Sequence, residues 1–192
     1  MKKVPVFATA LVIAAAAVMV ALGLWQMQRA QWKHDLIARY QAAMSEPDAV
    51  GLPTNQTEQE ERLFRKVEFS CDRVISRSSI AGRNASGQAG WAQVAACGTA
   101  EGEFEVALGW SVDPAARGDW QGGMVSGLLG SAGEGVRVVA APPLGGLQQL
   151  VQPDPRDLPN NHMAYAVQWF FFAMTALVIY VLALRGRLRA GT

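Results

Sequence analysis

Cysteine and histidine are scarce in this chain of 192 residues, which contains two of each. The two cysteines, Cys71 and Cys97, are too far apart in sequence for the C-x-x-C spacing of a redox or zinc motif. No C-x-x-C-H sequence occurs, which by this criterion excludes covalent attachment of a c-type haem. Cu(I) chaperones use soft thiolate sites, and two thiols remote in sequence do not suggest one.

Charged residues are absent from two long apolar runs, Val4–Trp25 and Met163–Leu184. Each run has about 22 residues, which as a helix covers roughly 33 Å and is enough to cross a bilayer. The backbone in lipid must satisfy its own hydrogen bonds, so both runs are predicted to be helices. The alternative for the first run is a signal peptide, but the apolar region of a signal peptide is shorter and no suitable A-x-A cleavage site follows.

Acidic residues are absent from both ends of the chain, because all 16 lie between the two apolar runs. The same central segment contains 12 of the 17 basic residues, so its net charge is −4. The tails carry Lys2, Lys3, Arg185, Arg187 and Arg189. Basic residues next to a span favour the cytoplasmic side. We therefore expect a two-pass protein of the inner (plasma) membrane with both termini cytoplasmic and the central domain periplasmic. A negative central segment also provides no basic footprint for nucleic acid.

The central segment reads as a helical extension followed by a mainly antiparallel β domain. Helix formers continue without glycine or proline as far as residue 46. Apolar alternation then predicts strands at 62–74, 91–97, 104–110, 124–130, 135–142 and 147–153. The polar stretches 45–61 and 78–90 are predicted to be loops.

These patterns predict a membrane protein in which two transmembrane α-helices flank a mainly antiparallel β (α+β) extracytoplasmic domain. Its parts are a first transmembrane helix at 4–27, a helical extension at 28–46, a β-rich domain at 47–161, a second transmembrane helix at 162–184 and a basic cytoplasmic tail at 185–192. An oxidising compartment permits a disulfide between Cys71 and Cys97, and two free buried thiols are the alternative.

Recognisable settings for a catalytic nucleophile are also absent. Ser111, in GWSVDP, lacks the G-x-S-x-G sequence of a nucleophile elbow. Both histidines, His34 and His162, lie next to the apolar runs and are far from Ser111 in sequence. A membrane-anchored hydrolase is therefore only an alternative, and we expect the chain not to be an enzyme.

His162 stands at the entrance of the second apolar run and is the candidate binding residue. Tyr165 and Trp169 follow three and seven residues later, so they share its helix face. A neutral imidazole can bind haem iron axially, and an apolar pocket suits a porphyrin. The alternative is a histidine that lies among lipid headgroups.

The first helix carries a second aromatic and basic group at its end. Trp25, Arg29 and Trp32 are spaced i, i+4, i+7 and so share one face. Tryptophan at a helix end also suits the aromatic belt of a membrane interface, and the charged tip of Arg29 or Lys33 can reach headgroups.

Four segments, in order along nearly the whole chain, resemble the Surfeit locus protein 1 family, which assists cytochrome c oxidase assembly. LGLWQMQRAQWKHDLI is similar to the family's L-G-x-W-Q-x-x-R-x-x-W-K pattern, and LPNNHMAYAVQWFFFA to its N-x-H-x-x-Y-A-x-x-W-F pattern. FRKVEFSCDRV and VALGWSVDP resemble its less specific Y-R-x-V-x-V-x-G and V-N-R-G-W-V-P segments. Departures from these two occur at Phe64, Cys71 and Leu108.

The resemblance implies an assembly factor that helps deliver or insert haem a into the catalytic subunit of the oxidase. It implies His162 as the contact to the haem iron. The other residues implied for the site are Tyr165, Trp169, Trp25, Arg29, Trp32 and Lys33. The cations of Arg29 and Lys33 would pair with a haem propionate. The implied partners are oxidase subunit I, the enzymes of haem a biosynthesis and the lipid bilayer. A scaffold that stabilises an assembly intermediate without haem is the alternative.

Overall fold

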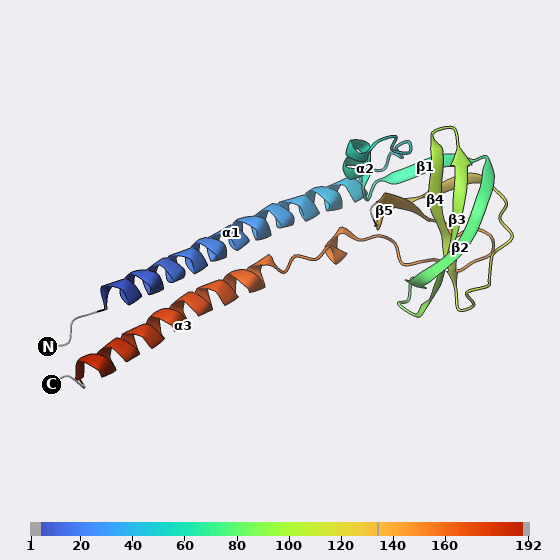
Figure 1. The fold of residues 1–192 in the computed structure, drawn as a ribbon. Helices are drawn as coiled ribbons and strands as arrows, with labels where there is room; N and C mark the ends of the chain where they lie inside the picture. The colour runs from blue at the N-terminus through green and yellow to red at the C-terminus, as the bar shows by residue number, and fades with distance from the viewer. Residues whose placement is uncertain (1–4, 134, 190–192) are drawn as a thin grey trace. The chain divides into compact units, whose positions relative to one another are not determined.

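The computed structural model describes residues 5–133 and 135–189, which form two compact units. Two long helices make up most of the first unit, and a six-stranded sheet makes up most of the second (Figure 1). The predicted membrane protein, with two apolar helices flanking a β domain, is confirmed. Lys2, Lys3, residue 4 of the predicted first span and residues 190–192 of the predicted tail lie outside the described residues.

The helix α1 spans Val6–Met44 without a break, and α3 spans His162–Arg189. Both are long and apolar enough to cross a membrane. The 39 residues of α1 extend over about 58 Å, which exceeds the hydrocarbon core of a bilayer. Its last residues, 37–44, belong to the unit that contains the sheet. There, the ring of Tyr40 packs against Phe64 with 5.1 Å between centroids, and burial raises the pKa of the Tyr40 hydroxyl.

Small residues form the line along which α1 and α3 pack. The buried positions of α1 are Ala16, Gly23 and Ala30, and those of α3 are Ala166 and Ala173. Each set is spaced by seven residues, close to two helical turns, so each lies on one helix face. Small side chains let helix backbones approach closely within lipid, where packing replaces the hydrophobic effect.

Side-chain contacts at both ends of the helix pair show that the two helices run antiparallel. The hydroxyls of Thr9 and Tyr180 share a hydrogen bond near one end. Near the other end, Asn160 Nδ2 donates to the carbonyl oxygen of Ala30 at 3.3 Å. These contacts set which turns of the two helices face each other.

Replacing Gly23 with alanine is expected to destabilise the helix pair. A Cβ at this position would lie 2.7 Å from Phe170 Cε1, so the ring or the helix must move. Such overpacking costs about 1–3 kcal/mol, against a gain of at most about 1 kcal/mol from removing a helical glycine. Gly186→Ala is the matched control, because nothing lies within 4 Å of its Cβ position. Thermal unfolding in detergent should show a lower midpoint for Gly23→Ala only; equal midpoints would contradict the packing described.

The second unit is built on six strands in the order β1-β5-β6-β4-β3-β2. Their bounds are β1 Lys66–Cys71, β2 Arg73–Arg83, β3 Ala89–Thr99, β4 Gly102–Ser111, β5 Gly123–Ala132 and β6 Gly135–Ala140. Neighbouring strands are antiparallel except for β4 and β6, which pair in parallel. The sheet is therefore mainly antiparallel, as predicted, with one parallel pair that the alternation could not indicate.

A single bent strand joins the two ends of this sheet. β1 and β2 are first and last in the strand order, yet Asp72 alone separates them in the chain. The Asp72 N–H donates to the Gly98 carbonyl at 3.0 Å, which continues the pairing of β2 with β3. Cys71 and Cys97 are bonded, which links β1 to β3 and settles the question left open by the sequence. The bend and the disulfide thus bring the two ends of the sheet together, and the sheet curves into a barrel in which β1 and β2 are not paired with each other.

The barrel has an apolar interior and a second apolar cluster on its outer face. On β4, Val106 and Leu108 are buried in the interior, while Ala107 between them belongs to the outer cluster. Trp110 and Leu150 complete the main contacts of that outer cluster. This two-sided burial explains why the middle of β3 and of β4 is buried at consecutive positions and not only at alternate ones.

Three predictions about loops and strands are wrong. The stretch 78–90 is not a loop, because β2 continues to Arg83 and pairs with β3 along its length. Its serines sit on a strand with only one neighbour, where polar residues are tolerated. The turn is confined to the residues after Asn84, whose Oδ1 accepts from the N–H groups of Ser86 and Gln88 at 3.1 and 2.9 Å.

The stretch 147–153 was predicted as a strand, but it forms only isolated bridges, from Gln148 and Leu150 to neighbouring segments. Residues 45–61, predicted as a loop, contain most of a short helix, α2, at Gln56–Arg62. Asn55 caps α2 by accepting from Glu58 N–H at 3.0 Å. A three-residue 3₁₀ turn, Pro155–Asp157, precedes α3.

Candidate functional site

His162, the first residue of α3, contacts α1 through the side chain of Gln26. The distance between His162 Nδ1 and Gln26 Oε1 is 2.7 Å, although the two residues are 136 positions apart in sequence. Gln26 lies three residues after Gly23 and four before Ala30, so it borders the packing line of α1. The antiparallel packing is therefore what brings the amide to the imidazole.

This hydrogen bond decides which ring nitrogen is available to a ligand. An amide oxygen can only accept, so Nδ1 carries the proton and donates it to Gln26. In the neutral ring, Nε2 then has a free lone pair. A hydrogen bond that fixes the tautomer and orientation of an imidazole is the usual support of a metal-binding histidine. In the neutral ring, the geometry thus leaves Nε2 as the nitrogen that could bind a ligand.

Asn160 holds the chain just before α3 against α1. Its Nδ2 donates to the Ala30 carbonyl, and the Tyr165 N–H bonds to the Asn161 carbonyl as the first turn of α3 forms. The asparagine amide therefore connects the two helices in place of acting as a helix cap. His162 stands two residues after this anchor, which limits its freedom to move away from Gln26.

Tyr165 and Trp169 lie on the same side of α3 as His162, which we call the Gln26–His162 flank of the helix pair. They follow His162 by three and seven residues, about one and two turns. Tyr165 is half exposed, and Trp169 is half-buried with an edge-to-face contact to Phe172 at 6.3 Å between centroids. The structure therefore brings the three α3 residues predicted for the site onto one flank.

The residues predicted on α1 divide between two sides of that helix. Lys33 is seven residues after Gln26 and shares its flank. Trp25 and Trp32 are about 200° and 180° around α1 from Gly23, which points them away from α3. Both indoles are about half exposed, at 50% and 47%.

Arg29 lies between these two sides. Its guanidinium carbon is 4.5 Å from the ring centroid of Trp32, which is a cation–π contact. Its backbone position, three residues after Gln26, is on the Gln26–His162 flank. Sequence reasoning missed Gln26 as a site residue; the signal that could have found it is a polar side chain beside a line of small residues at a membrane interface.

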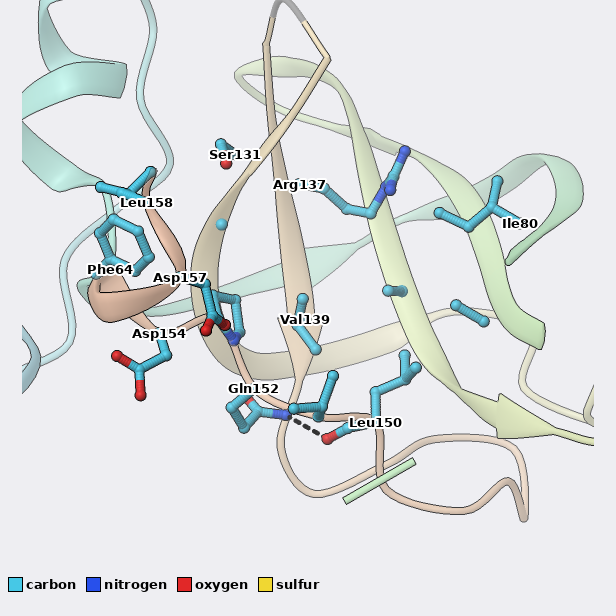
Figure 2. Close-up of a pocket in the computed structure, with 15 residues that line it drawn as sticks. Phe64, Ile80, Ser131, Arg137, Val139, Leu150, Gln152, Asp154, Asp157 and Leu158 are labelled. Carbon is cyan, nitrogen blue, oxygen red and sulfur yellow. Dashed lines mark hydrogen bonds between the residues drawn. The ribbon is translucent and has the colours of Figure 1, made fainter. Parts of the chain in front are cut away.

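The barrel carries a separate cleft of about 310 Å³ on its outer face. Ile80, Val139 and Leu150 are among its apolar lining residues, and Phe64 lies on the side opposite Ile80 (Figure 2). Arg137 at the rim donates from Nε to Glu105 Oε2 at 2.8 Å. No residue predicted for the site lines this cleft. Within residues 5–133 and 135–189, moreover, no three His, Cys, Asp or Glu side chains gather as a metal site.

The model of the SURF1 family matches residues 13–174, which include α1 from its second turn, the whole barrel and the first half of α3. No curated protein matches the chain.

Proposed function

Because this chain belongs to the SURF1 family and so serves the assembly of cytochrome c oxidase, we propose that it holds haem a at His162 and passes it to the catalytic subunit. In this role the protein binds and orients a cargo, and none of its residues is required to perform chemistry. The proposed partners are oxidase subunit I, as recipient, and the enzymes of haem a biosynthesis, as source.

The single observation that carries this proposal is the contact between His162 Nδ1 and Gln26 Oε1 at 2.7 Å. It orients the ring and, in the neutral imidazole, leaves the lone pair on Nε2, which is the form that binds haem iron. A histidine that merely lies among headgroups has no need of a fixed tautomer. When bound, the haem iron would complete its coordination at this nitrogen.

The polarity of the Gln26–His162 flank also suits a haem. The helices are antiparallel, so residues after Gln26 and residues after His162 lead in opposite directions. Tyr165 and Trp169 lead toward the middle of the helix pair, where a porphyrin ring would find apolar surroundings. Lys33 lies about 10 Å along the axis in the other direction. There it would meet the propionates, as would Arg29.

The disulfide supports the proposed topology, with both termini cytoplasmic and the barrel outside the cytoplasm in the periplasm. Disulfides form and persist in oxidising compartments. Cys71 and Cys97 are both in the barrel and are bonded. Arg185, Arg187 and Arg189, at the far end of α3, favour the cytoplasmic side for that end.

Deleting the gene is expected to remove haem a from the oxidase while leaving other membrane haems in place. Reduced-minus-oxidised spectra of membranes, with and without a plasmid-borne copy, measure this directly. Oxidase subunits should still be detectable by immunoblot in the deletion strain. Unchanged oxidase spectra would contradict the proposed function.

A haem-free scaffold is the second candidate, because the barrel also presents a mainly apolar cleft in which a partner protein could bind. It predicts that subunits and haem are lost together on deletion and that the purified protein carries no Soret band. Delivery predicts a Soret band on the purified protein after co-expression with haem a synthesis.

A further inference from the structure

We propose that the other flank of the helix pair holds a Cu(I) site formed by the thioethers of Met27 and Met163 and the imidazole of His34. A pocket of about 270 Å³ lies there within the helix unit. Its lining residues are Met27, Ala30, Gln31, His34, Asn160 and Met163. Two sulfur atoms and an imidazole from two helices thus border one cavity.

The helix geometry explains why the two methionines meet. Met27 follows Gln26, and Met163 follows His162, the two residues in contact at 2.7 Å. Successive helical residues point about 100° apart, so each methionine lies across the packing line from its neighbour. In keeping with this, neither Gln26 nor His162 lines the pocket. We call this side the Met27–Met163 flank.

Ala30 and Asn160 also line the pocket and are joined by the 3.3 Å hydrogen bond from Asn160 Nδ2 to the Ala30 carbonyl. This bond holds the two chain segments together where the pocket lies. His34 is four residues after Ala30, one turn along the same face. The pocket is therefore lined from both helices.

The donor set selects a soft, monovalent metal. Thioether and imidazole are ligands that suit Cu(I), whereas zinc sites are built from thiolate, imidazole and carboxylate. Both cysteines are consumed in the disulfide, so the thioethers are the soft sulfur donors that the chain can offer. Met27 and Met163 are 43% and 53% exposed, so their flexible side chains can turn toward a shared ion.

A carboxylate next to His34 offsets the charge of the ion. Asp35 Oδ1 lies 3.8 Å from His34 Nδ1 and accepts a hydrogen bond from Gln31 Nε2 at 3.1 Å. The carboxylate is therefore close to the imidazole without a direct hydrogen bond to it. Two thioethers and an imidazole are all neutral, so the negative charge of Asp35 balances a bound Cu(I).

Cu(I) titration of the full-length protein in detergent tests this proposal. Under anaerobic conditions with ascorbate and a competing Cu(I) chelator, the wild type should bind one Cu(I) per chain. The Met27→Leu/Met163→Leu double variant conserves side-chain volume and should bind at least about tenfold more weakly. X-ray absorption should show sulfur neighbours of copper that disappear in the double variant. Zn²⁺ offered alone should not occupy the site.

Matched controls separate this site from the rest of the chain. Met174→Leu changes an equally exposed methionine of α3 that does not line the pocket, and it should leave Cu(I) affinity unchanged. His162→Ala should also bind Cu(I) as the wild type does, and the double methionine variant should retain haem a. The proposal is overturned if the wild type fails to compete for Cu(I), or if the double variant and Met174→Leu bind it equally. Neither result would bear on haem binding at His162.

Discussion

Replacing His162 with alanine is expected to abolish the Soret band of protein purified after co-expression with haem a synthesis. The substitution removes the nitrogen that the contact with Gln26 prepares for iron. Porphyrin held only by apolar contacts would be lost during purification, so the haem content should fall to less than about a tenth of the wild-type value. The measurement is the pyridine haemochrome spectrum per mole of protein.

Two companion variants make this result specific. Gln26→Ala keeps the imidazole but frees its orientation, and loss of such a supporting hydrogen bond weakens metal binding by about 10–100-fold. The expected order of haem content is therefore wild type, then Gln26→Ala, then His162→Ala. His34→Ala removes the chain's other imidazole, on the Met27–Met163 flank, and should keep the wild-type content. Equal haem in His162→Ala and the wild type would remove His162 from the site.

Removing the disulfide is expected to cause the largest loss of stability in the barrel. Cys71 and Cys97 are separated by 26 positions and join β1 to β3, which are not neighbours in the strand order. The chain-entropy relation for a loop of this size gives about 3.5 kcal/mol. For a domain of this size that corresponds to a fall in the unfolding midpoint of order 15 °C.

Thermal unfolding of the Cys71→Ala/Cys97→Ala double variant in detergent measures this effect. Each single variant should lose about as much as the double variant, because either change breaks the bond. Treating the wild type with reductant should lower its midpoint to a similar value and leave that of the double variant unchanged. A midpoint within a few degrees of the oxidised wild type would show that strand pairing alone closes the barrel.

The two transmembrane helices were predictable because long uncharged runs have few alternatives in water or lipid. The interior strands were predictable wherever one face is buried, as in β1, whose residues alternate between exposed and buried. The alternation could not reveal β2, since most of its side chains are not buried and its serines resemble a loop. Its pairing comes from β3, which supplies hydrogen bonds whatever the side chains are.

The candidate site could be predicted only in part. The spacing of Trp25 and Trp32 correctly places them on one face of α1, but local spacing does not say which face meets α3. The face of α1 that meets α3 is determined by Ala16, Gly23 and Ala30, whose small size lets the two backbones approach closely. The partner of His162 lies 136 positions away, so no local pattern identifies Gln26.

The bent strand that closes the barrel also sets an order of events during synthesis. β1 pairs with β5, so Lys66 must wait for Leu128 to emerge before it gains its partner. At about 5–20 residues per second this delay lasts several seconds, and α3 is made only afterwards. The strands of the nascent barrel can therefore pair before α3 packs beside α1. The contact between Gln26 and His162 then forms after the barrel, when α3 joins a helix that was made before it.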